Sequence, residues 1–252
     1  VQSYVVNSSI KITAVVSTNN KTGKISVTTA SGSGTSVDSL YVVSKVSSIN
    51  PNYGKVGDTV ILTGASFTGA SAVKLDGVNV QSYTVLSDDS IRAVISSSNT
   101  TGKMTVTTIA GAGTSTDSFY VTPTITSITP SNGVVGSSFV IKGTKFKVLT
   151  SVKLDGVNVS SYTLSGDTSI TAVVSSANTT GRVTVSNPRT SVTSTDSFYV
   201  KPNITSISPN YGLVGSSVTI TGTKFTGATS VKIGADTVDS YTVNSETSIT
   251  AV

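Results

Sequence analysis

The sequence predicts an all-β protein built from tandem two-sheet β-sandwiches. Three observations predict this fold class. Apolar and polar residues alternate over short stretches of the 252-residue chain, turn-forming residues separate these stretches, and the whole pattern returns every 79 residues. No stretch shows the apolar period of a helix.

The repeat is most visible in its prolines, glycines and tyrosines. Its register never shifts by insertion or deletion, although loops normally vary in length at little cost. Four sets of residues keep the spacing: Pro51, Pro130 and Pro209; Gly57, Gly136 and Gly215; Gly23, Gly102 and Gly181; Tyr4, Tyr83, Tyr162 and Tyr241. Such an array indicates modules of one kind.

The register divides the chain into two complete and two partial repeats. Residues 44–122 and 123–201 are complete, whereas 1–43 is the C-terminal part of a repeat and 202–252 is the N-terminal part of another. We expect the chain to be a window on a longer array. The alternative is that the partial repeats complete each other between neighbouring chains by strand exchange. The opening VQSYVVNSSIKITAV matches the closing VDSYTVNSETSITAV in phase, so joining them would leave one strand too many.

We expect about seven short strands in each repeat. In the second complete repeat, residues 124–128 alternate between two prolines and are expected as an edge strand. Residues 130–136 hold two glycines and predict a turn. Residues 137–143 predict a strand that ends at a glycine.

A hairpin and three further strands complete the repeat. Residues 150–164 alternate on both sides of an Asp-Gly dipeptide, which favours a type I′ turn and predicts a hairpin. Residues 169–176 predict a strand whose apolar residues share one face, and 179–187 and 194–200 predict the last pair. Alternating Ile, Val and Phe residues are expected to form the core between two sheets.

The stretch NPNYGKVGDTVILTGASF, residues 50–67, contains the residues that we expect the backbone conformation of each repeat to require. Its glycines Gly54 and Gly57 are expected where the backbone needs a positive φ or a close approach. Phe67 is expected to fill the end of a sheet after Gly64. Two further residues are expected to point into the core from one strand: Val60 and Leu62.

The three copies of this stretch share the pattern P-x-x-G-x-x-G-x-x-[VF]-x-[IL]-x-G-x-x-F. The pattern resembles the signature of IPT/TIG domains, an immunoglobulin-like family, and the resemblance covers the complete and the partial repeats. It implies a β-sandwich without the immunoglobulin disulfide, which suits a chain with no cysteine. IPT/TIG domains occur in prokaryotic surface proteins, in receptor ectodomains, beside glycan-processing domains and in transcription factors, so the fold does not choose a function.

Composition narrows the function classes. Ser and Thr supply roughly a third of the residues, far above ordinary usage. The net charge of +5 comes from scattered Lys and Arg, whereas nucleic-acid binding needs them gathered on one face. No stretch is long and apolar enough to span a membrane. Without Cys and His the chain lacks thiolate metal ligands and the usual catalytic base, so we expect no enzyme, no metal and no cofactor.

The acidic candidates favour structural interpretations. Asp76-Gly77 and Asp155-Gly156 could suggest calcium, but turn chemistry explains them, and the third copy, Gly234-Ala235, lacks the acid.

The other charged candidates also occur in single repeats. Asp88 and Asp89, near Arg92, are expected in a solvated loop. Three lysines of one repeat could meet an acidic neighbour, although alternation favours an exposed strand face: Lys142, Lys145 and Lys147.

The recurring tyrosines favour a packing role, although a row of them could also face a neighbouring chain. Six Asn-x-Ser/Thr acceptors are present: Asn7, Asn20, Asn99, Asn158, Asn178 and Asn203. Asn99 and Asn178 share one repeat position beside a predicted turn, so glycosylation there is a hypothesis.

These features predict a structural segment of a long extracellular or cell-surface protein, most similar to prokaryotic surface proteins. We expect a stalk or a self-assembling filament, formed by end-to-end and lateral packing of the modules. The alternatives are an adhesin or glycan-binding array, with a cell-surface glycan or protein as partner, and an accessory region of a secreted glycan-active enzyme.

Overall fold

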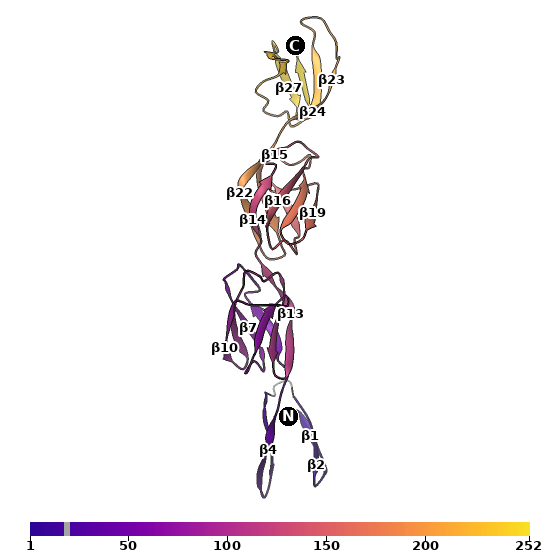
Figure 1. The fold of residues 1–252 in the computed structure, drawn as a ribbon. Helices are drawn as coiled ribbons and strands as arrows, with labels where there is room; N and C mark the ends of the chain where they lie inside the picture. Colours follow the sequence, from indigo (N-terminus) through magenta and orange to yellow (C-terminus); the bar gives the residue numbers. More distant parts are fainter. Residues whose placement is uncertain (18–20) are drawn as a thin grey trace. The chain divides into compact units, whose positions relative to one another are not determined.

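The computed structural model describes residues 1–17 and 21–252. Within them every regular element is a β-strand, numbered β1 to β28 along the chain (Figure 1). The chain divides into two compact units, Val1–Thr122 and Pro123–Val252, which are described separately. The all-β expectation is confirmed.

Residues 1–43 form two antiparallel pairs. β1 (Ser3–Ser8) pairs with β2 (Lys11–Val15), and β3 (Gly23–Thr29) pairs with β4 (Gly32–Leu40). Many of their apolar side chains are exposed, and the described residues of this segment contribute to no buried cluster.

Residues 44–122, here called the first complete module, form two sheets. The four-stranded sheet has the order β10 (Ser82–Ser87), β11 (Ser90–Val94), β7 (Thr59–Ala65) and β5 (Lys45–Asn50). The five-stranded sheet has the order β6 (Tyr53–Gly54), β13 (Gly111–Val121), β12 (Gly102–Thr108), β8 (Ala72–Leu75) and β9 (Val78–Asn79). All pairs are antiparallel except β6 with β13.

Residues 123–201, the second complete module, repeat this topology. The four-stranded sheet has the order β14 (Thr124–Thr129), β16 (Ser138–Thr144), β20 (Ser169–Val173) and β19 (Ser161–Ser165). The five-stranded sheet has the order β15 (Asn132–Gly133), β22 (Ser191–Val200), β21 (Gly181–Ser186), β17 (Ser151–Leu154) and β18 (Val157–Asn158). β14 is an edge strand, as predicted.

Residues 202–252 form the same four-stranded sheet and one further pair. The sheet has the order β23 (Asn203–Ser208), β24 (Val218–Thr223), β28 (Ser248–Ala251) and β27 (Tyr241–Ser245). β25 (Lys232–Ile233) pairs with β26 (Asp236–Thr237).

Each complete module has nine strands rather than about seven. The two additional strands, β6 and β9 or β15 and β18, span two residues each. They are too short for an alternation of apolar residues to reveal them, and the other seven agree with the expectation.

The two sheets of each complete module enclose one apolar core. In the second module the rings of Phe139 and Phe198, from opposite sheets, lie 4.5 Å apart between centroids. Val60 and Leu62 of the first module are buried as predicted. Alternation along each strand therefore identified the core, because successive side chains of a strand point to opposite faces.

The glycines of the repeated stretch have the predicted roles. A Cβ atom on Gly143 would lie 1.9 Å from the carbonyl oxygen of Thr124 and 2.5 Å from Cζ of Phe146. β14 and the buried Phe146 ring therefore fit against β16 only where that strand has no side chain. Three glycines adopt positive φ at the preceding turn: Gly57 (+88°), Gly136 (+83°) and Gly215 (+85°).

The predicted hairpin over residues 150–164 is only partly correct. β17 and β18 form a tight hairpin with two paired positions, and the chain then crosses to the other sheet as β19. The alternation continues through this crossing because both sheets share one core. It therefore reports which side chains point inward, and not which sheet a strand joins.

Candidate functional site

Asn178, a predicted glycosylation site, is fully buried. Its Nδ2 donates to the carbonyl oxygens of Leu154 (3.3 Å), Val157 (3.0 Å) and Asn158 (3.3 Å). Its Oδ1 accepts from the backbone N–H of Ser175 at 2.8 Å. One amide thus ties the β17–β18 turn to the loop after β20.

Asn99 has the same role in the first module. It is fully buried, and its Nδ2 donates to the carbonyl oxygens of Val78 (3.0 Å) and Asn79 (3.2 Å). A glycan would attach to this nitrogen, so the geometry gives the glycosylation hypothesis no support, and it stays a prediction. Asn20, at the equivalent position of the first segment, lies outside the described residues.

The Asp-Gly dipeptides form turns, as the sequence favoured. Asp76 and Gly77 have φ of +50° and +80°, the signs that a type I′ turn requires. The Asp76 carboxylate also accepts from the Thr100 hydroxyl at 2.6 Å. Across the described ranges, no three His, Cys, Asp or Glu side chains form a group that could hold a metal.

Asp88 and Asp89 lie in the turn between β10 and β11 and Asp89 is exposed, as predicted, but the Asp88 side chain is only 15% exposed. Its Oδ1 accepts from the Thr68 backbone N–H at 3.2 Å, and its carbonyl accepts from Phe67 N–H at 2.8 Å. Lys21 Nζ lies 3.5 Å from its Oδ2. Partial burial acts to raise the pKa of Asp88, but hydrogen bonds from Thr68, the Lys21 charge and a bond from Ser66 outweigh it and hold the pKa below the ordinary 3.8.

The lowered pKa of Asp88 predicts acid sensitivity of the first module. Because folding favours the carboxylate form, its stabilisation is complete above pH 3.8 and is lost as the pH falls through the lower folded pKa. We expect Asp88→Asn to flatten the acid dependence of the unfolding midpoint, measured by thermal denaturation at neutral pH and at a series of values below 3.8. An unchanged acid slope in the variant would contradict this.

The three lysines of the second module do not share one strand face. Lys142 is exposed on β16, Lys147 is exposed in the following turn, and Lys145 is only 9% exposed. Lys145 follows the end of β16 with φ of +65°, so the strand alternation does not extend to it.

Two of the recurring tyrosines have identical structural contacts. The hydroxyls of Tyr83 and Tyr241 each donate, at 3.0 Å, to the carbonyl oxygens of Ala70 and Ala228 respectively. Their rings pack against the core of their own module, which supports the predicted packing role. Tyr4 is exposed.

Tyr162 packs against the core in the same way but lacks this contact. Among the hydrogen bonds of the described residues, none involves its hydroxyl. The difference follows from the sequence at the acceptor residue and the residue before it. Val148-Leu149 stands where the other modules have Gly69-Ala70 and Gly227-Ala228. Gly69 and Gly227 have φ of +75° and +78°, a conformation that a β-branched valine avoids, and Val148 does not adopt a positive φ.

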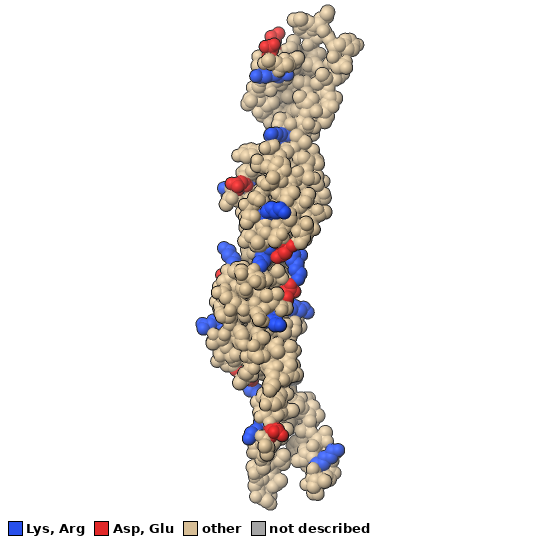
Figure 2. Space-filling view, viewed as in Figure 1, with Lys and Arg blue, Asp and Glu red and all other residues tan. Residues whose placement is uncertain are grey.

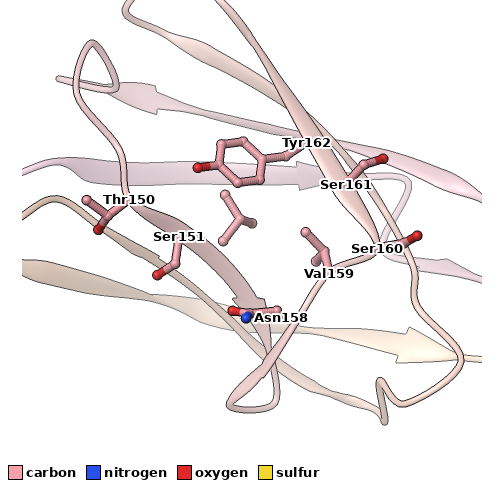
Figure 3. Close-up of a pocket in the computed structure, with 8 residues that line it drawn as sticks. Thr150, Ser151, Asn158, Val159, Ser160, Ser161 and Tyr162 are labelled. Carbon is pink, nitrogen blue, oxygen red and sulfur yellow. The ribbon is translucent and has the colours of Figure 1, made fainter.

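A crevice of about 390 Å³ lies beside Tyr162. It separates β17 and the β18 end from the start of β19, and two buried valines, Val152 and Val159, contribute its apolar part. Figure 3 shows the Tyr162 ring across the crevice from Asn158, with the phenol oxygen directed toward the end where Thr150 lies. The remaining lining residues are polar and uncharged: Thr150, Ser151, Asn158, Ser160, Ser161 and Tyr162.

A second cavity, of about 420 Å³, lies in residues 202–252 against Ile204, Ile207 and Ile220. In the first complete module the corresponding face is covered by β12 and β13. This cavity is therefore part of an uncovered core face rather than a built binding site.

The surface carries few charges. On the face that Figure 2 shows, Lys and Arg lie singly or in small groups between uncharged residues. In the described part of the chain, no helix has the length and hydropathy to cross a membrane.

The paired sheets, the shared core and the repeated turns define tandem β-sandwich modules of the immunoglobulin-like class. The chain belongs to the IPT/TIG domain family, whose model matches residues 44–122, 123–200 and 202–252. The resemblance seen in the sequence is thereby confirmed.

Solved structures similar to this chain include three of note. A protein crystallised with a xylogluco-oligosaccharide has 20% identity and a TM-score of 0.44, over 84% of this chain and 54% of its own. The Plexin A4 extracellular region has 20% identity and a TM-score of 0.31, over 82% and 20%. A surface glycan-binding protein from Prevotella bryantii has 18% identity and a TM-score of 0.38, over 65% and 39%.

The chain thus spans about half, or less, of the length of these solved structures. No curated protein matches its sequence.

Proposed function

We propose that the chain is a non-catalytic stalk segment of an extracellular or cell-surface protein. The observation that supports this proposal is the short, proline-containing linker between successive modules. Two residues separate β13 from β14, and two separate β22 from β23, with a proline in each pair. Proline fixes φ and a short linker limits reorientation, so the modules are suited to hold another domain at a distance.

If the chain is a stalk, the range of distances within the molecule in solution should depend on the short linker between the two complete modules. Insertion of a Gly/Ser segment of about ten residues between Thr122 and Pro123 is expected to broaden the distance distribution measured by small-angle X-ray scattering, because such a segment behaves as a random coil. The same insertion in the turn at residues 109–110 of the first module, after the exposed Ile109, serves as the control for added mass. Equal broadening by both insertions would contradict the proposal.

Self-assembly into a filament was part of the expectation from sequence. Within the two complete modules, residues 44–201, no described feature favours lateral packing over a stalk, so we propose only the stalk.

Glycan binding is the second candidate function. One of the similar structures contains a xylogluco-oligosaccharide, and another is a surface glycan-binding protein. The polar crevice beside Tyr162 supports the same class of ligand for this chain. Calorimetric titration of the chain with oligosaccharides tests this candidate. Absence of binding would exclude glycan binding and would not affect the proposal of a stalk.

A further inference from the structure

We infer that the crevice beside Tyr162 binds one ring of a neutral saccharide. The inference deepens the glycan-binding candidate, on which it rests, by giving it a site, a ligand class and a structural origin. It does not depend on the stalk.

The crevice lies where one module departs from its repeat. Val148-Leu149 replaces the Gly-Ala of the other two copies, and the hydroxyl of Tyr162 loses the carbonyl partner that Tyr83 and Tyr241 have. A tyrosine hydroxyl at a half-buried position usually has a partner. In this module a bound ligand can supply one, because the hydroxyl is directed along the crevice (Figure 3).

The lining selects an uncharged ligand with many hydroxyl groups. None of its eight residues carries a charge, so it offers nothing that would favour a phosphate, a carboxylate or an ammonium group. The side-chain polar atoms of Ser151, Asn158 and Tyr162 take part in no hydrogen bond among the described residues. They can donate to and accept from sugar hydroxyls, which themselves act as donors and acceptors.

The size and the apolar part of the crevice fit one sugar ring. About 390 Å³ is at the low end of the volumes of small-ligand sites. A pyranose ring has apolar C–H faces, which can pack on the half-buried tyrosine ring, whereas the two valines are almost fully covered and offer little surface. An entirely apolar ligand would leave the surrounding hydroxyl and amide groups without partners, which costs free energy.

The experiment is an NMR titration of the full chain, labelled with ¹⁵N, with cellohexaose, maltohexaose and a hexamer of galacturonic acid as probes. We expect at least one neutral probe to shift backbone signals of residues 150–162, and the acidic probe to bind more weakly. Shifts confined to other residues would support glycan binding by the chain but overturn this site. Absence of shifts with both neutral probes, or preference for the acidic one, would also overturn it.

Matched variants separate binding from folding. Tyr162→Phe keeps the ring and removes the hydroxyl, so we expect affinity to fall about tenfold with an unchanged unfolding midpoint. Tyr83→Phe removes the same atom where it bonds to Ala70, so we expect a lower midpoint of the first module and unchanged affinity. Full affinity in Tyr162→Phe would overturn the inference.

The origin of the crevice has its own test. Val148→Gly with Leu149→Ala restores the sequence of the other modules, and we expect the crevice to close and saccharide binding to be lost. Leu149→Ala alone controls for the core contact of that side chain. A double variant that remains folded and binds like the wild type would contradict the assignment.

Discussion

Replacing Gly143 by alanine is expected to destabilise the second complete module by about 3–5 kcal/mol. The added methyl group would meet the Thr124 carbonyl oxygen at 1.9 Å and the Phe146 ring at 2.5 Å. Neither can move alone, because the first belongs to β14 and the second is fully buried in the core. β14 must therefore separate from β16, or the ring must leave its site.

Gly136→Ala is the matched control. Gly136 has φ of +83°, but a Cβ atom there would meet no atom within 4 Å. Its replacement should cost only the strain of a left-handed alanine, about 1 kcal/mol. Denaturant unfolding of the full chain, resolved by module through amide hydrogen exchange, measures both. If Gly143→Ala lowers the unfolding free energy no more than Gly136→Ala does, the close approach of the Thr124 carbonyl and the Phe146 ring does not explain the glycine at this position.

The core and the glycine roles could be predicted from the sequence because each follows from local geometry. Alternation identifies the inward face of a strand, and a glycine spaced regularly before a phenylalanine marks a close approach. Other features depend on contacts distant in sequence. Ser66, Lys145 and Lys224 share one repeat position and adopt φ of +57° to +65°, yet none is a glycine, so no local signal indicated the left-handed backbone.

The candidate site was visible in the sequence only as a departure from the repeat. Val148-Leu149 stands where the other copies have Gly-Ala, but the consequence requires knowing that the Ala70 carbonyl accepts from Tyr83. The same limit applies to Asn178. As part of an Asn-x-Thr acceptor it resembles a surface residue, and only its three carbonyl partners reveal that it is internal.

Asn178→Ala is expected to destabilise the second complete module by about 3 kcal/mol, because it leaves several buried polar groups without partners. The Ser175 N–H loses its acceptor, and the carbonyl groups of the β17–β18 turn lose their shared donor. Asn178→Asp should be worse at neutral pH. It keeps an acceptor for Ser175, but it places a buried negative charge against those carbonyl oxygens.

Asn158→Ala provides the control for Asn178, since the Asn158 side chain is exposed and has no hydrogen-bond partner among the described residues. We expect its unfolding free energy to stay within about 0.5 kcal/mol of the wild type. Asn99→Ala should reproduce the loss in the first module, because Asn99 makes the equivalent bonds to the turn of β8 and β9. Equal stability of Asn178→Ala and Asn158→Ala would show that the buried amide is not a stabilising tie. Loss in one module without loss in the other would show that the repeats are folded alike but held by different contacts.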